Sequence, residues 1–234
     1  MSTPSTPSAP REPLPFPADW DSLLVLVPHP DDPEYGTAAA VAKWTAAGKT
    51  VRYALASSGE VGIAGMAPEQ AGPLREDEQR RAAAIVGVGD VDFWGFPDSN
   101  IRNTAELRAK IASVIGEVRP DVVVAIYGGA EFGPGMPNQR DHIEFAAAVT
   151  DAWDSLADPP PWLFQNGPEP THAEMVGDYL DAAVDSLAAH EVYLSVLDPS
   201  TPVREQAGAV VAMTTSGHPR GPAAGFILQR SAQR

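Results

Sequence analysis

Cysteine is absent from this chain of 234 residues. Its absence excludes disulfides, thiolate metal ligands and cysteine nucleophiles, and it fits a reducing compartment, so we expect a cytoplasmic protein. No apolar run approaches the roughly 18–20 residues that cross a bilayer. Lysine and arginine number 16 against 31 aspartate and glutamate residues, which gives a net charge of −15. We therefore expect neither nucleic acid nor an anionic membrane surface as a partner.

Nucleotide-binding glycine motifs are missing as well. Neither Gly-x-Gly-x-x-Gly nor a Walker sequence occurs, although the loops 59–73 and 128–139 are rich in glycine and proline and long enough to frame a pocket. The chain is 44% hydrophobic, which is enough for one sizeable core. We expect a single domain over residues 19–234, preceded by a proline-rich, disordered or extended N-terminal arm over residues 1–18.

Strand-like runs alternate with helical patterns in this domain. The expected strands cover residues 23–28, 51–57, 91–95, 121–127 and 162–164. The expected helices lie near residues 36–47, 74–87, 104–118, 140–156, 176–190 and 201–212. Such alternation predicts an α/β protein with a Rossmann-like three-layer fold, in which helices cover both faces of a mostly parallel sheet.

The most informative stretch is His29-Pro30-Asp31-Asp32, which directly follows the apolar run at 23–27. A short run of Val and Leu is typical of a buried parallel strand, and the residues after Asp32 read as the start of a helix. The polar cluster therefore lies at the carboxyl end of a strand, where open α/β sheets bind ligands. One imidazole and one carboxylate can ligate a divalent metal, and the second carboxylate can act as a base. A simple turn is the alternative.

A second polar cluster, Gln139-Arg140-Asp141-His142, follows another buried-strand pattern at 122–127 and a glycine- and proline-rich loop. A helical apolar rhythm comes after it, so His142 is expected in the first turn of a helix. In a doubly wound sheet two such strand ends can face one crevice. His142 can then complete a ligand set with His29 and one of the aspartates.

The chain resembles the LmbE-like, or PIG-L, family of zinc-dependent de-N-acetylases. The resemblance covers roughly residues 22–215 and is carried by five segments in the family's order, at 29–36, 57–62, 75–88, 93–98 and 187–190. It implies three ligands for Zn²⁺ or another divalent metal, which are His29, Asp32 and His142. It also implies that Asp31 is the general base, which takes a proton from water as the water attacks an amide carbonyl.

The resemblance further implies contacts with a polar, usually sugar-like, substrate. Arg75 and Asp98 match family positions with this role, although an exposed arginine and a turn aspartate are the alternatives. His190 matches a family position near the site, so it is a candidate for substrate binding or for supporting the site. An interaction with the dipole at a helix C-terminus is the alternative for His190.

The second cluster departs from the family's pattern. Gln139 and Arg140 stand where the family usually has a histidine and a proline, and that histidine helps to stabilise the tetrahedral intermediate. Gln139 can donate a hydrogen bond but cannot carry a titrating proton. Removing one oxyanion donor costs on the order of 10²–10³ in rate in other enzymes. Arg140 could compensate by binding substrate, or it is an ordinary surface cation.

We predict a zinc-dependent hydrolase of amide-type C–N bonds that removes an acetyl group from a small polar or amino-sugar-like substrate. An amidase that cleaves a larger acyl or thiol-conjugated amide is one alternative. A metal-retaining binding protein with weak hydrolysis is the other, and the presence of Asp31 argues against it. The expected partner is a small-molecule substrate, and the sequence leaves open whether the protein is a homo-oligomer.

Overall fold

The computed structural model describes residues 12–232 as one α/β unit. The parallel strands are β2 (Ser22–Val27), β3 (Thr50–Leu55), β4 (Asp90–Phe93), β5 (Val122–Ala125) and β8 (Trp162–Asn166). The same sheet also contains β1 (Leu14–Pro15), β9 (His172–Met175) and β10 (Ala223–Ser231). A separate two-stranded hairpin consists of β6 (Glu131–Gly133) and β7 (Met136–Pro137).

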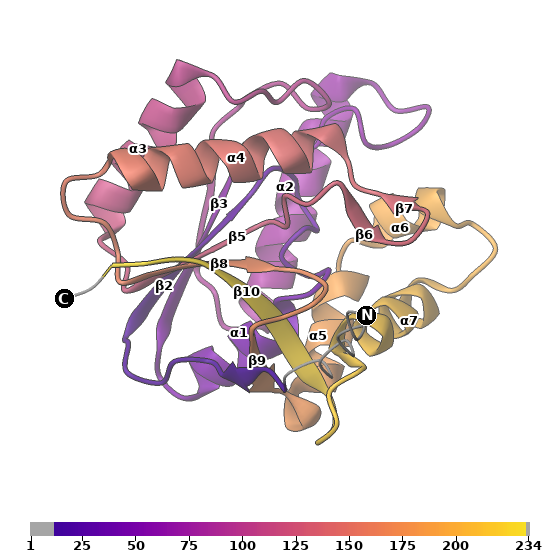
Figure 1. Cartoon of the computed structure of the whole chain (residues 1–234). Coiled ribbons are helices and arrows are strands. Elements are labelled where there is room, and N and C mark those ends of the chain that lie inside the picture. Colours follow the sequence, from indigo (N-terminus) through magenta and orange to yellow (C-terminus); the bar gives the residue numbers. More distant parts are fainter. Residues whose placement is uncertain (1–11, 233–234) are drawn as a thin grey trace, which may run out of the picture.

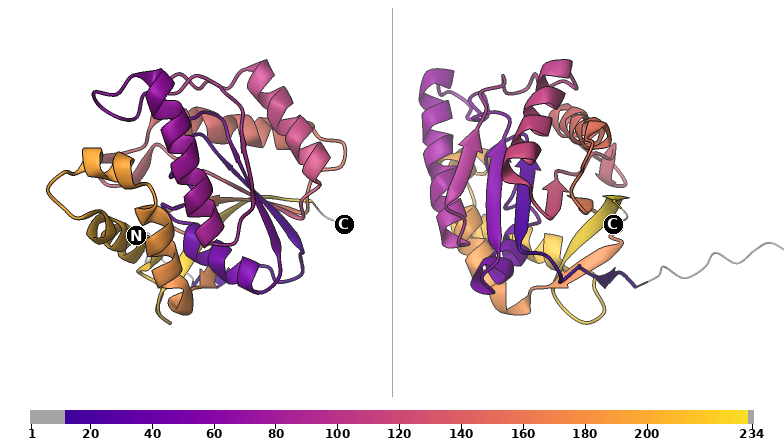
Figure 2. Two further views of the ribbon diagram at one scale, coloured as in Figure 1. Left: turned by 180° about the vertical axis from the view of Figure 1, so that it is seen from behind. Right: turned by 90° about the vertical axis from the view of Figure 1, so that its left-hand side faces the viewer.

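The helices are α1 (Ala38–Ala46), α2 (Pro68–Ile85), α3 (Ala105–Val118), α4 (Arg140–Ser155), α5 (Leu180–Ala188), α6 (Glu191–Leu197) and α7 (Val203–Thr215). A 3-10 turn, η1 (Gly177–Tyr179), leads into α5. Helices α3 and α4 cover one face of the sheet, and α1, α2 and α5 cover the other (Figures 1 and 2). Among residues 12–232, no helix combines the length and apolarity needed to span a membrane.

The strand order of the large sheet is β1-β9-β10-β8-β5-β2-β3-β4. Strands β8, β5, β2, β3 and β4 are parallel to their neighbours, whereas β10 is antiparallel to both β8 and β9. The prediction of an α/β fold with a mostly parallel sheet between two helical layers is confirmed. Strand β2 is the middle one of the five parallel strands, and five of its six residues are buried, as its continuous apolar run requires.

The start of the domain differs from the expected boundary at residue 18. Leu14–Pro15 pairs with β9, and the side chain of Phe16 is only 5% exposed. Its ring lies 4.8–4.9 Å from the rings of Trp44, Phe164 and Phe226, so it belongs to the main core. An aromatic residue between two prolines gave no periodic signal for this packing. The rest of the expected arm, residues 1–11, lies outside the described residues.

The loop expected at 59–73 is shorter in the structure, because α2 begins at Pro68 and contains Pro73. Proline fits the first turn of a helix, and Pro68 occupies that position. The loop that follows β5 instead contains the β6–β7 hairpin. Residues of both segments, Gly62 in the first and Phe132 and Met136 in the second, line one cleft together with His29 and His142.

Candidate metal centre

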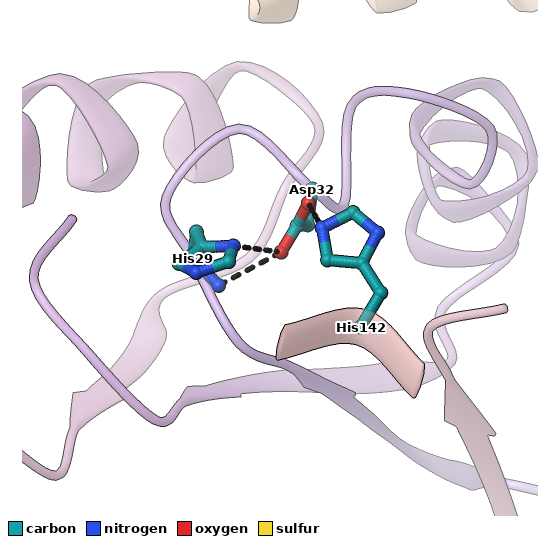
Figure 3. Close-up of side chains that lie close together, drawn as sticks. All are labelled: His29, Asp32 and His142. Carbon is teal, nitrogen blue, oxygen red and sulfur yellow. Dashed lines mark hydrogen bonds and ion pairs between the residues drawn. The ribbon is translucent and has the colours of Figure 1, made fainter. Parts of the chain in front are cut away.

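Two neighbouring strand ends bring the two polar clusters of the sequence together. Strand β2 pairs with β5 in parallel, so the segment after β2 and the start of α4 meet at one edge of the sheet. Figure 3 shows the result: Asp32 lies between the rings of His29 and His142. Asp32 Oδ2 accepts a hydrogen bond of 2.8 Å from the backbone N–H of His29 and lies 3.5 Å from His29 Nδ1. Asp32 Oδ1 lies 3.2 Å from His142 Nε2.

These three side chains fit a divalent cation. One ligand atom from each lies within 4.8 Å of the other two, and all three residues are buried. His142 Nε2 lies close to Asp32 but makes no hydrogen bond within residues 12–232, nor does His142 Nδ1. Burying a ring nitrogen without a hydrogen-bond partner costs free energy, and a bound cation would remove this cost. Two imidazoles and one carboxylate are a donor set suited to Zn²⁺.

Asp32 is held in the ionised form that a metal ligand requires. Burial alone would raise its pKa, but the imidazoles of His142 and His29 outweigh burial and hold the pKa well below its usual range. A carboxylate must be deprotonated to bind a metal. The protonation state of Asp32 therefore agrees with a role as ligand.

A second pair of carboxylates faces the opposite nitrogen of His29. His29 Nε2 lies 3.2 Å from Asp98 Oδ1 and 3.3 Å from Asp141 Oδ2. Burial opposes charge on the imidazole, but Asp141, Asp32 and Asp98 together raise the pKa of His29 above its usual value. Histidine ligands commonly donate their second N–H to a carboxylate, which fixes the ring. The family resemblance implies a substrate contact for Asp98, and no role was predicted for Asp141. The structure brings both to His29.

Asp31 lies on a tight turn between the two ligands of the first cluster. Its φ angle of 82° falls in the left-handed region, where few residues other than glycine, asparagine and aspartate occur. Its backbone N–H donates to Gln79 Oε1 at 2.8 Å, which holds this turn against α2. Burial raises the pKa of the Asp31 carboxyl to about 6, although the charge of Arg75 opposes the shift.

Arg75 supports the same turn from α2. One of its terminal nitrogens lies 2.9 Å from Asp31 Oδ1 and donates to the carbonyl of Pro30 at 2.7 Å. The guanidinium also lies 4.1 Å from the ring centre of Tyr193. Arg75 lines the cleft described below, but it is only 3% exposed. That it contacts substrate stays a prediction, because most of its donors already bind this chain.

A cleft of about 1190 Å³ opens in front of the two clusters. Gln139, directly before α4, lines the cleft, is exposed, and makes no capping hydrogen bond with the described residues through its side chain. Arg140 is not part of the lining, its side chain is 69% exposed, and it lies 3.7 Å from Glu144 on the same helix. The surface interpretation therefore holds for Arg140, and it does not replace the missing histidine.

His190 lies outside the cleft, which favours a supporting role over a substrate contact. It is fully buried, and His190 Nε2 lies 3.3 Å from Glu34 Oε2. Glu34 also accepts hydrogen bonds from Gln79 and Ser186. This network joins the turn that carries the first cluster to α2 and α5. Sequence reasoning missed it because its members are separated by up to 156 residues.

We expect His190→Ala to lower the free energy of unfolding by about 3 kcal/mol, because it leaves the buried carboxylate of Glu34 without its imidazole. Urea unfolding followed by circular dichroism measures the change. The matched control is His172→Ala, which removes a partly exposed imidazole outside the cleft and should cost less than about 1 kcal/mol. Equal losses in the two variants would contradict a special role for the Glu34 pair.

Two tyrosines in the cleft were also missed. Tyr35 and Tyr193 line it beside Asp31. The charge of Asp31, followed by burial, raises the pKa of Tyr193, so its hydroxyl keeps its proton and can donate a hydrogen bond. Tyr35 follows the first cluster directly and could have been noticed. Tyr193 lies on α6, a helix that the sequence pattern did not separate from its neighbours.

Known proteins share both the sequence and the fold. The family described as PIG-L, GlcNAc-PI de-N-acetylase, matches residues 24–153, which is more than half of the chain. A probable N-acetyl-alpha-D-glucosaminyl L-malate deacetylase 2 from Bacillus anthracis is 29% identical over 185 residues, covering 72% of this chain and 79% of that protein.

Solved structures show the same fold at lower identity. An N,N'-diacetylchitobiose deacetylase from Pyrococcus horikoshii is similar with a TM-score of 0.71 and 16% identity, over 90% of this chain and 84% of that one. A 4-carboxy-2-hydroxymuconate hydratase from Pseudomonas putida has a TM-score of 0.66 and 20% identity, over 92% and 99% of the two chains.

The chain is therefore a hydrolase of the deacetylase class, which acts on non-peptide C–N bonds. It belongs to the PIG-L family, as the resemblance of its motifs implied.

Proposed function

We propose that this protein is a zinc-dependent de-N-acetylase that hydrolyses the acetamide of an amino-sugar substrate in the cleft. The proposal is carried by the buried carboxylate of Asp31, which lies beside the group of His29, Asp32 and His142. In that group the ring nitrogens of His142 have no hydrogen-bond partner among the described residues. The names of the relatives, which act on N-acetylated sugars, support the substrate class.

The residues of the chain divide the chemistry between them. His29, Asp32 and His142 would hold the zinc ion, which when bound polarises an amide carbonyl and acidifies water. Asp31 accepts the proton of the attacking water and then delivers it to the departing amine. Burial raises the pKa of the Asp31 carboxyl, which makes it a better proton acceptor than an exposed carboxylate. Arg75 holds Oδ1 of Asp31, so we assign the proton to Oδ2.

Beyond what a bound metal would supply, the chain offers only neutral donors to the oxyanion. Gln139, which stands where the usual histidine is expected, lines the cleft. Tyr193 on α6 also lines the cleft, and its protonated hydroxyl is a second donor. Neither group carries a positive charge, and neutral hydrogen bonds are weaker than charge-assisted ones. The site is therefore expected to hydrolyse simple acetamides more slowly than one with a histidine.

The proposal predicts metal-dependent release of amine and acetate. Purified protein is assayed with N-acetylglucosamine derivatives, and both products are measured before chelation, after chelation and after addition of Zn²⁺. We expect activity to disappear with the metal and to return with Zn²⁺. Arg140→Ala is the control, because Arg140 lies outside the cleft and its loss should leave activity unchanged. Amine release that survives full removal of the metal would refute the proposal.

The hydratase among the structural relatives does not point to a second function. At 20% identity the likeness shows the fold alone. The assay above separates the two reactions, because a hydratase adds water to a double bond and releases neither acetate nor amine. The amidase alternative stays open to the same assay, in which a larger acid would be released in place of acetate.

We expect Gln139→His to increase hydrolysis of a simple N-acetyl substrate, by less than the roughly 100-fold of one full oxyanion contact. The imidazole adds a donor that can carry charge at a position that lines the cleft. Steady-state kinetics at constant zinc occupancy measures the effect. A loss of activity would mean that the amide of Gln139 is itself an essential contact. No change would mean that residue 139 does not reach the carbonyl oxygen.

A further inference from the structure

Four large, exposed apolar side chains line the cleft, and the reaction proposed above does not use them. We call these four residues the apolar wall: Phe132, Met136, Leu197 and Met213. Two of them come from the β6–β7 hairpin and two from α6 and α7, which follow more than 50 residues later in the sequence. Figure 1 shows these elements on the same side of the molecule.

The side chains of the wall are unusually open to water. Their exposed fractions are 38% for Phe132, 52% for Met136 and 58% for both Leu197 and Met213. Nine large apolar side chains are exposed within residues 12–232, and these four line the same cleft. Single exposed apolar residues are normal on a protein surface, but a group that shares one concave site marks a place where an apolar ligand binds.

One member of the wall lies near the proposed metal ligands. The ring of Phe132 lies 6.4 Å from the ring of His142, nearly at a right angle to it. It also lies 5.5 Å from the ring of Tyr127, so it packs against another aromatic side chain. The volume of about 1190 Å³ exceeds the range of roughly 300–1,000 Å³ that drug-sized ligands need. The cleft thus has room for much more than an acetamide and one sugar ring.

We propose that the substrate carries an apolar chain or ring, which lies along the apolar wall while the amide lies at the metal ligands. This inference rests on the proposed function, from which it takes the reacting amide. A plain amino sugar would leave the four apolar side chains in water, whereas an apolar group would bury them. Methionine adapts to irregular apolar shapes, so Met136 and Met213 can fit a flexible chain. The apolar group is attached either to the glycosidic oxygen or to the amide as its acyl part.

Three substrates test the inference and identify the attachment. They are the methyl glycoside of N-acetylglucosamine, its hexyl glycoside, and the methyl glycoside of N-hexanoylglucosamine. We expect one hexyl compound to exceed the methyl reference in kcat/KM by about 50-fold, the scale of three buried methylene groups. Preference for the hexyl glycoside places the apolar group on the sugar, and preference for the hexanoyl amide places it on the acyl side. Equal kcat/KM for all three would overturn the proposal.

Two variants connect the preference to the wall. Leu197→Ser and Met213→Ser each remove an apolar side chain of the wall that is not in contact with the metal ligands, and each should move the hexyl-to-methyl ratio towards one. Ile85→Ser is the matched control, because Ile85 is 45% exposed on α2 and lies outside the cleft. Its ratio should stay at the wild-type value. A ratio that persists in both wall variants would assign the preference to another surface.

A binding measurement separates this inference from the proposed function. Hexyl and methyl glucoside, which contain no amide, are compared by calorimetry below the concentration at which hexyl glucoside aggregates. Tighter binding of hexyl glucoside, lost in Leu197→Ser, supports the wall even if no amide is hydrolysed. Hydrolysis of the methyl reference without any hexyl preference or hexyl binding would leave the proposed function standing and overturn the wall. A dimer in sedimentation that Leu197→Ser dissociates would likewise overturn it, because a second copy would then cover the wall.

Discussion

We expect Asp31→Asn to lower the rate of amide hydrolysis by roughly 10²–10⁴ while the metal content stays near that of the wild type. Asparagine keeps the size of the side chain but cannot accept the proton of the attacking water. It also tolerates the φ angle of 82° at this position, so the turn that carries the ligands is kept. Single-turnover kinetics together with elemental analysis of the same sample measures both quantities.

The variant also removes the negative partner of buried Arg75. Its free energy of unfolding is expected to fall by up to about 3 kcal/mol, so kinetics are measured well below the unfolding transition. The matched control is Asp158→Asn, an exposed residue of the same type outside the cleft, which should change neither rate nor stability. If Asp31→Asn hydrolyses amide at the wild-type rate, another group accepts the proton.

We expect His142→Ala to weaken metal binding strongly. Loss of a residue that only supports a metal ligand costs roughly 10–100-fold in affinity, and loss of a ligand itself should cost more. The variant deletes one of the three proposed ligands, whose ligand atoms lie within 4.8 Å of one another. The fold should survive, because α4 is anchored by buried side chains such as Phe145 and Val149 rather than by a metal. Competition with a chromogenic chelator measures the affinity, and circular dichroism checks the fold.

The control for this variant is His172→Ala, which removes a histidine on β9 outside the cleft. It should bind metal like the wild type. Full metal occupancy of His142→Ala under the same competition would remove His142 from the ligand set. The metal would then need another ligand beside His29, and the carboxylates of Asp98 and Asp141 lie next to His29 Nε2.

The sequence predicted the centre of the fold better than its edge. Buried parallel strands such as β2 and β5 have continuous apolar runs, and long helices such as α3 and α4 have a clear period, so local patterns suffice. Strand β10 has nine residues with a glycine at Gly225, follows a proline-rich turn, and is defined by antiparallel pairing with β8 and β9. Its partners lie more than 45 residues away, and no local pattern specifies them.

The same distinction applies to the candidate site. His29, Asp32 and His142 follow or begin elements whose positions are set by parallel topology, so their approach could be predicted from the chain. The ion pair of Arg75 with Asp31 depends on how α2 packs over the sheet edge, and this is a tertiary property. The contact of Asp141 with His29 is also a tertiary property, because it depends on how the first turn of α4 is placed relative to the end of β2.

The edges of the eight-stranded sheet bear on how the protein can associate with itself. At one edge β1 has two residues, one of them Pro15, which cannot donate to a neighbouring strand. At the other edge β4 has four residues, and the charged side chains of Asp90 and Asp92 alternate along it. Short, charged or proline-containing edges discourage a second sheet from pairing with them. Continuation of the sheet from one copy into another is therefore unfavourable, and a homo-oligomer would have to form through helices or loops.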